Sequence, residues 1–154
     1  MLTEKQIWLT YSLNHDKMKN GGGNVTITEI KTHFGNYSLC VNYISILLEI
    51  IEKYQKKLSN KRLDFAHEEY RQMIEWIRED LKRNKDYEEK ILSLFDYCES
   101  DYDRKLIRRR YIEQEKLFNI AYDICYSERM TQILYKRIFQ KLAANTKDLP
   151  NIKF

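Results

Sequence analysis

The chain has 154 residues, which fits one ordinary domain or a domain with an appendage. One proline, four glycines and 32% charged residues favour a mostly helical protein, and the net charge of +4 permits nucleic-acid binding without requiring it. The chain shows no nucleophile paired with a base, no metal-ligand spacing and no cofactor loop, so we expect neither an enzyme nor a bound metal or cofactor.

Residues 1–24 are predicted to form a short helix followed by a flexible joint. Thr3 can cap a helix over residues 1–18 whose apolar stripe contains Ile7, Trp8 and Tyr11. Three consecutive glycines, 21–23, then indicate the joint. The sequence argues against a phosphate-binding loop here, because no Lys-Ser/Thr pair follows these glycines and no apolar strand precedes them.

A long helix is predicted after the joint, with Thr28 as its cap and Gly35-Asn36 as a kink or as its true start. Its apolar residues fall on two positions of a seven-residue repeat: Tyr37, Ile44, Ile51 and Leu58 on one, and Cys40, Leu47 and Tyr54 on the other. Such a seam suits a helical hairpin within the chain or a homo-oligomer formed through residues 37–58.

Two further helices complete a predicted hairpin and oligomerisation region over residues 25–100. Asp64 is expected to cap the first, which extends to Asn84, and Asp86 to open the second, which ends near Ser100. Their inward stripes are Phe65, Tyr70, Met73, Ile74, Ile77 and Leu81, then Tyr87, Ile91, Leu94, Phe95 and Cys98. Trp76 lies at the edge of the first stripe and fits either core or contact surface.

Residues 101–146 read as two short helices and a longer one, before a tail at 147–154. A helix over 104–111 precedes an apolar face of Ile120, Ala121 and Ile124, and Ser127 can cap the last helix. We expect that helix to turn Met130, Leu134, Ile138 and Leu142 toward the core. Between residues 101 and 142 there are ten basic and six acidic side chains, an excess equal to that of the whole chain.

This segment resembles the C-terminal helix-turn-helix of phage late-gene transcriptional regulators of the ArpU/RinA type, which is similar to region four of bacterial sigma factors. The resemblance lies in Arg110-Tyr111, the polar step 113–116, Ile120-Ala121, Tyr126-Ser127, and Tyr135-Lys136-Arg137 leading to Lys141-Leu142-Ala143. The chain departs from the family where a corner glycine would supply positive φ, and where Thr131 replaces valine.

The resemblance implies an all-α protein, a long helical hairpin plus a third helix followed by a helix-turn-helix, that binds double-stranded DNA and regulates phage or prophage late genes. Base edges would be reached by Glu128, Arg129, Gln132 and Ile133. Phosphates would be contacted by Arg108, Arg109, Lys116, Lys136, Arg137 and Lys141. The long helices would supply dimerisation or a contact with RNA polymerase. Arg108 and Arg109 also suit a helix C-terminus without any partner.

Two alternatives stay open: a helical protein-interaction module, such as an anti-repressor or adaptor, without DNA binding, and a phage small terminase subunit assembled as a ring. Cys40, Cys98 and Cys125 lie far apart among apolar neighbours and read as buried thiols of a reducing compartment. No apolar run looks long enough to cross a membrane, so we expect a cytoplasmic protein without a membrane partner.

Overall fold

The structure, a computed structural model, describes residues 26–60 and 66–146, and every regular element within those ranges is helical. The all-α fold expected from composition is therefore confirmed. The expectations for residues 1–24, for Asp64 and Phe65, and for the tail at 147–154 lie outside the described residues.

Helix α2 (Ile27–Leu58) has its N-cap two residues before the expected one. Thr26 is the N-cap: its hydroxyl accepts from the Glu29 backbone N–H at 3.2 Å, while the Glu29 carboxylate accepts from the Thr26 N–H at 2.6 Å. This reciprocal capping box satisfies two backbone donors, so Thr28 is helical instead of capping. The helix continues through Gly35, the residue at which a kink or a later start was expected.

Helix α3 (His67–Ser93) is continuous where a break before Asp86 was predicted. Asn84, Tyr87 and Ile91 are buried at helical spacing and prolong the stripe that contains Ile77, so packing holds the helix together across the polar stretch. The expected third helix is thus the end of α3 together with the 3-10 helix η2 (Leu94–Tyr97). The residues expected to face inward there are buried or half-buried.

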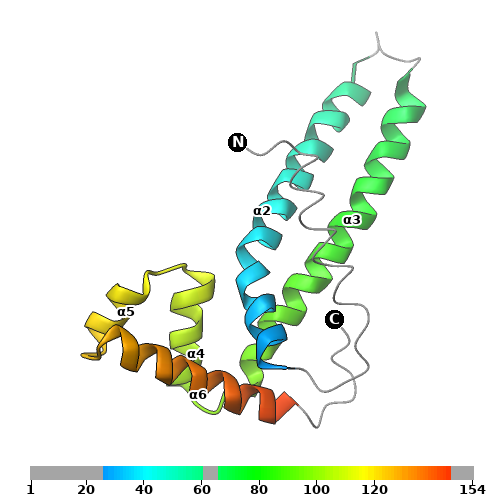
Figure 1. Ribbon diagram of the computed structural model, residues 1–154. Helices are drawn as coiled ribbons and strands as arrows, with labels where there is room; N and C mark the ends of the chain where they lie inside the picture. Colours follow the sequence, from blue (N-terminus) through cyan, green and yellow to red (C-terminus); the bar gives the residue numbers. More distant parts are fainter. Residues whose placement is uncertain (1–25, 61–65, 147–154) are drawn as a thin grey trace.

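The two long helices lie side by side as an antiparallel hairpin (Figure 1). A hydrophobic cluster between them contains Tyr43, Leu47 and Ile51 of α2 with Ile74 and Ile77 of α3. The seven-residue seam therefore packs against α3 of the same chain. Of the two arrangements that suit the seam, a helical hairpin or a homo-oligomer, the structure shows the hairpin. The contact between the two helices also has a polar part, since the Tyr43 hydroxyl donates to Asp80 Oδ2 at 2.7 Å.

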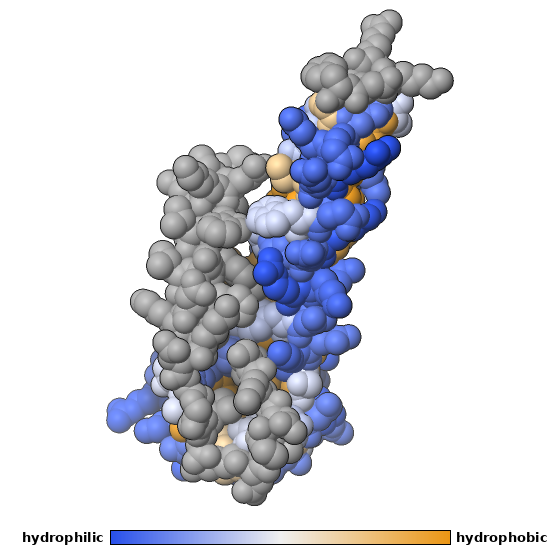
Figure 2. Space-filling model, turned by 90° about the vertical axis from the view of Figure 1, so that its right-hand side faces the viewer, coloured by the Kyte–Doolittle hydropathy of each residue, from blue (hydrophilic) through white to orange (hydrophobic). Residues whose placement is uncertain are grey.

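Some apolar side chains of the hairpin stay outside this cluster. Met73, expected on the inner stripe, is 41% exposed, because it lies at the edge of the face that carries Ile74 and Ile77. Trp76 is 48% exposed, which places it on the surface. In Figure 2 hydrophilic residues cover most of the described face, with hydrophobic ones showing between them.

Helix α2 is long and apolar enough to count as a candidate membrane span, contrary to the expectation that no run reaches that length. Core helices meet the same test of length and composition, and one face of α2 packs against α3.

Three helices form the C-terminal unit. Helix α4 (Asp101–Ile107), capped by the Ser100 hydroxyl, continues into the π-helical turn η3 (Arg108–Ile112). Helix α5 (Leu117–Asp123) follows, and α6 (Glu128–Thr146) lies across the end of the hairpin (Figure 1).

The C-terminal unit shares one hydrophobic core with the base of the hairpin. The Phe34 ring of α2 lies 5.1 Å from that of Phe95, 6.0 Å from that of Tyr111 and 6.2 Å from that of Phe139. Such aromatic pairs contribute roughly 0.5–1.5 kcal/mol each beyond the burial of their area. Phe34 therefore anchors α6 to the hairpin and fixes which side of α6 remains exposed.

Candidate nucleic-acid interface

The turn between α5 and α6 is a tight corner closed by two backbone hydrogen bonds. The Tyr126 N–H donates to the Ala121 carbonyl at 2.9 Å and the Cys125 N–H to the Tyr122 carbonyl at 3.1 Å. This pair of bonds is the Schellman arrangement, which needs a left-handed residue just after the helix. Cys125 is that residue, with φ of 57°. The conformation for which the regulators that this segment resembles use glycine is thus adopted here by cysteine.

Ser127 caps α6 as predicted. Its hydroxyl accepts from the Met130 N–H at 3.2 Å, and its carbonyl accepts from the Thr131 hydroxyl at 3.0 Å. Thr131 is fully buried, so this second bond satisfies a polar group that would otherwise be costly in the core. Threonine can replace valine at this position for that reason. Ile120 and Ala121, which are also buried, form the α5 side of the corner.

The inward face of α6 differs from the predicted one. Its buried side chains are Thr131, Tyr135, Ile138, Phe139, Leu142, Ala143 and Thr146. Met130, expected in the core, is 49% exposed, and Leu134 is half-buried. A strict repeat of four drifts around a helix of 3.6 residues per turn, so the first members of the predicted stripe leave the buried face.

The four side chains predicted to reach base edges, Glu128, Arg129, Gln132 and Ile133, all lie on the exposed side of α6. Among the described residues Arg129 makes no ion pair and Gln132 no side-chain hydrogen bond. They leave charged and amide groups facing solvent along the first two turns of the helix. No side chain of residues 26–60 or 66–146 covers this face.

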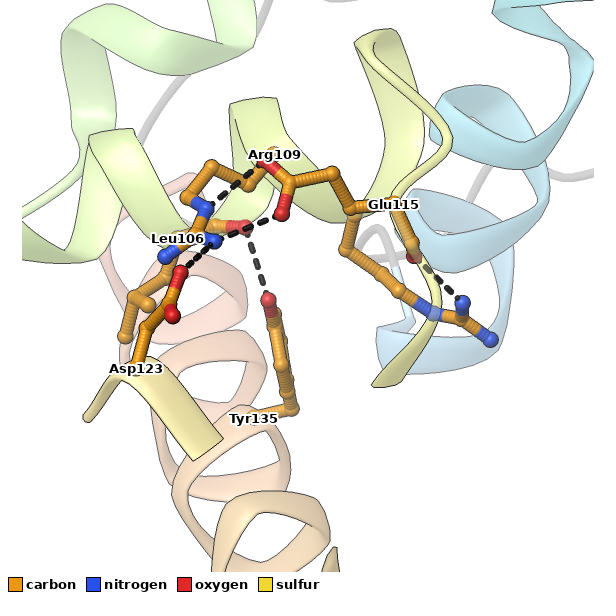
Figure 3. Close-up of polar contacts among 6 residues, drawn as sticks. Leu106, Arg109, Glu115, Asp123 and Tyr135 are labelled. Carbon is orange, nitrogen blue, oxygen red and sulfur yellow. Dashed lines mark hydrogen bonds and ion pairs between the residues drawn. The ribbon is translucent and has the colours of Figure 1, made fainter. Parts of the chain in front are cut away.

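Arg109, predicted as a phosphate contact, is held inside the unit (Figure 3). Its guanidinium donates to Glu115 Oε1 and Oε2 at 2.8 and 2.6 Å and to Asp123 Oδ2 at 2.5 Å. The hydrogen bonds that Arg109 donates to Glu115 and then to Asp123 raise the pKa of Arg109 above its ordinary value. Arg109 therefore joins η3, the following loop and α5, which is a structural role.

Other predicted phosphate contacts differ in how far they are engaged. Lys141 forms an ion pair with Glu99 at 2.5 Å. Arg108 is exposed, with its guanidinium 5.6 Å from the centre of the Phe95 ring, a cation–π geometry. Arg110, which is part of the family resemblance, donates to the Glu115 carbonyl at 2.8 Å. Together with the bonds from Arg109, this bond holds the loop before α5.

Lys116, Lys136 and Arg137 are exposed and form no ion pair within residues 26–60 and 66–146. Lys136 and Arg137 lie on α6, one turn after the candidate base-reading residues, and Lys116 is the N-cap residue of α5. Their charges are thus available to an anionic partner.

Below this surface, a buried hydrogen bond ties α6 to α4. The Tyr135 hydroxyl donates to the Leu106 carbonyl at 2.7 Å, and burial raises the pKa of this phenol (Figure 3). Tyr135 was named from the sequence only as part of the family resemblance. Its apolar neighbours at a spacing of three and four, Ile138 and Phe139, give the one signal that places it inward.

The expectation that all three cysteines are buried is wrong for one of them. Cys40 is buried and Cys98 half-buried, but Cys125 is exposed because it occupies the left-handed corner. Burial raises the pKa of the Cys98 thiol to about 11. Within the described ranges no group of three or more His, Cys, Asp or Glu residues is placed to hold a metal ion.

Sequence reasoning also missed exposed aromatic side chains at the corner. Phe118 and Tyr122 of α5 and Tyr126 in the turn after it are 62%, 77% and 50% exposed. Helical spacing puts Phe118 and Tyr122 on one face, but only the position of α5 shows that this face is outward.

Comparison with known protein families, with curated proteins and with solved structures finds no match to this chain.

Proposed function

We propose that the chain is a sequence-specific DNA-binding transcriptional regulator in which α5 and α6 act as a helix-turn-helix. The observation that carries the proposal is the exposed face of α6. A tight corner and a capped helix start are followed by Arg129 and Gln132, then by Lys136 and Arg137, with none of the three cations paired among the described residues. A recognition helix of this kind enters the major groove with its N-terminal half.

The roles of these residues follow from their chemistry. Arg129 can donate to guanine and Gln132 to adenine, and Glu128 can accept from the amino group of cytosine. Lys116, Lys136 and Arg137 would contact phosphates and set the position of the helix. Phage or prophage late genes as the target, and RNA polymerase as a partner, come from the family resemblance.

Binding should be tested with the full chain and duplexes enriched from a random library. Arg129→Ala and Gln132→Ala should each weaken binding to the enriched duplex by about 1–3 kcal/mol. The matched control is Lys82→Ala, an exposed cation on α3, which should leave affinity unchanged. Unchanged specific binding by both α6 variants would remove the readout assignment.

Salt dependence gives a second measure. If Arg108, Lys116, Lys136 and Arg137 neutralise four phosphates, the slope of log affinity against log salt is about −3.6. Affinity of one protomer then falls roughly a hundredfold between about 50 and 200 mM salt. Lys136→Ala should make the slope shallower by about 1.

A helical protein-interaction module is the second candidate, and the hairpin surface favours it. Leu39 and Leu48 of α2 are 52% and 47% exposed, and Met73 and Trp76 of α3 are similarly exposed. Met73 and Trp76 lie three residues apart on α3 and so adjoin on its surface, and adjoining exposed apolar side chains are typical of contact surfaces. This candidate is selected if the chain shows no salt-dependent affinity for any duplex. Self-association through residues 37–58 would use the exposed side of α2, because the seam packs within the chain, and light scattering that finds a monomer at tens of micromolar contradicts it.

A further inference from the structure

An apolar side chain lies at the centre of the exposed face of α6. Ile133 is 36% exposed, with Arg129 one turn before it and Arg137 one turn after it, so the three residues form one ridge along the helix. Met130, 49% exposed, lies beside Ile133 at a spacing of three residues. The ridge therefore has an aliphatic centre between two cations.

Both cations lack an ion-pair partner in the part of the chain described. A protein that covered Ile133 through an apolar contact would have to desolvate two guanidiniums or supply a carboxylate to each of them. A DNA duplex instead offers a guanine edge to Arg129, a phosphate to Arg137 and, between them in its major groove, an apolar group, the C5-methyl of thymine.

Gln132, which is next to Ile133, is also suited to an A·T base pair. Gln132 carries a side-chain amide, which can bond to both N6 and N7 of adenine in the major groove. Its exposed amide makes no hydrogen bond among the described residues. An amide and an aliphatic side chain at successive positions together match the groups that A·T pairs display.

We propose that Ile133, with Met130 beside it, recognises the C5-methyl of a thymine, so that the preferred duplex places A·T pairs opposite Gln132 and Ile133 in the second turn of α6. The inference rests on the proposed DNA binding and deepens it by naming the base and the atom that is contacted.

The test uses duplexes enriched by the full chain, resynthesised with uracil in place of one thymine at a time. Uracil lacks only the methyl group. Burying a group of that size contributes about 0.8 kcal/mol, which corresponds to about fourfold in affinity. We expect at least one position at which uracil weakens wild-type binding about fourfold, and at which Ile133→Ala binds thymine and uracil duplexes equally.

Leu92→Ala is the matched control, because Leu92 is 37% exposed but lies on α3. It should keep the wild-type response to uracil. Sequence-specific, salt-dependent binding that no uracil substitution weakens would overturn the thymine contact and leave the proposed function standing. Absence of any duplex binding would remove both. Since uracil changes the DNA alone, the wild-type measurement does not depend on how a variant folds.

Discussion

Replacing Cys125 by glycine should stabilise the protein, although the change deletes a side chain. Cys125 has a positive φ of 57° because the Schellman corner after α5 requires a left-handed residue. Its side chain is exposed, so its removal takes away little buried surface. The left-handed conformation costs an L-residue about 1–2 kcal/mol, and glycine avoids that cost.

Glycine also makes the unfolded chain more flexible, which costs about 0.5–1 kcal/mol. The difference leaves Cys125→Gly more stable by about 0.5–1 kcal/mol, or by roughly 1–4 °C in the unfolding midpoint for a chain of this length. Cys125→Val should go the other way, because a β-branched side chain tolerates positive φ poorly.

Urea and thermal unfolding followed by far-UV circular dichroism under reducing conditions would measure both variants. Gln140→Gly is the matched control, since Gln140 is exposed inside α6 and glycine there should cost about 1 kcal/mol. If Cys125→Gly destabilises as much as Gln140→Gly, the corner does not need a left-handed residue and the account of the turn is refuted.

Two further predictions concern the hairpin and the loop before α5. Asn84 is buried, and its Oδ1 has no hydrogen-bond partner among the residues that the structure describes, so Asn84→Leu should raise the free energy of unfolding by about 1–2 kcal/mol; a loss of stability in urea unfolding would contradict this. The hydrogen bonds from Arg109 hold the pKa of Glu115 below its ordinary 4.5, so this pairing contributes stability above that pH and loses it as pH falls through the folded-state pKa. The stability difference between wild type and Glu115→Gln should therefore shrink from about pH 6 to about pH 3, and a constant difference would argue against the pairing.

Local chemistry made several features of the C-terminal unit predictable. Ser127 was identified as the cap of α6 because a hydroxyl before an apolar periodic run satisfies a backbone N–H that the helix leaves open. Ile120 and Ala121 were identified as the buried side of the corner from their spacing and size. Such signals act over a few residues, so they can be identified in the sequence without knowing which elements pack against each other.

The boundaries of the long helices were less predictable because two signals compete there. Asp86 looks like a helix start, yet burial of Tyr87 and Ile91 against α2 carries α3 through it. Thr26 and Thr28 are both of a residue type that can cap a helix. Thr26 is the N-cap because Glu29 lies three residues after it and completes the capping box.

The amino-acid sequence by itself determined that this protein is helical, that α6 begins after Ser127, and that Arg129 and Gln132 stay out of the core, because propensity, capping and periodicity are local properties. Tertiary structure alone decided that Arg109 is tied to Glu115 and Asp123, that Met130 faces outward and that Cys125 takes the left-handed corner. These depend on how α4, α5 and α6 meet around Phe34 and the end of the hairpin, a contact between residues distant in the chain that no local pattern encodes.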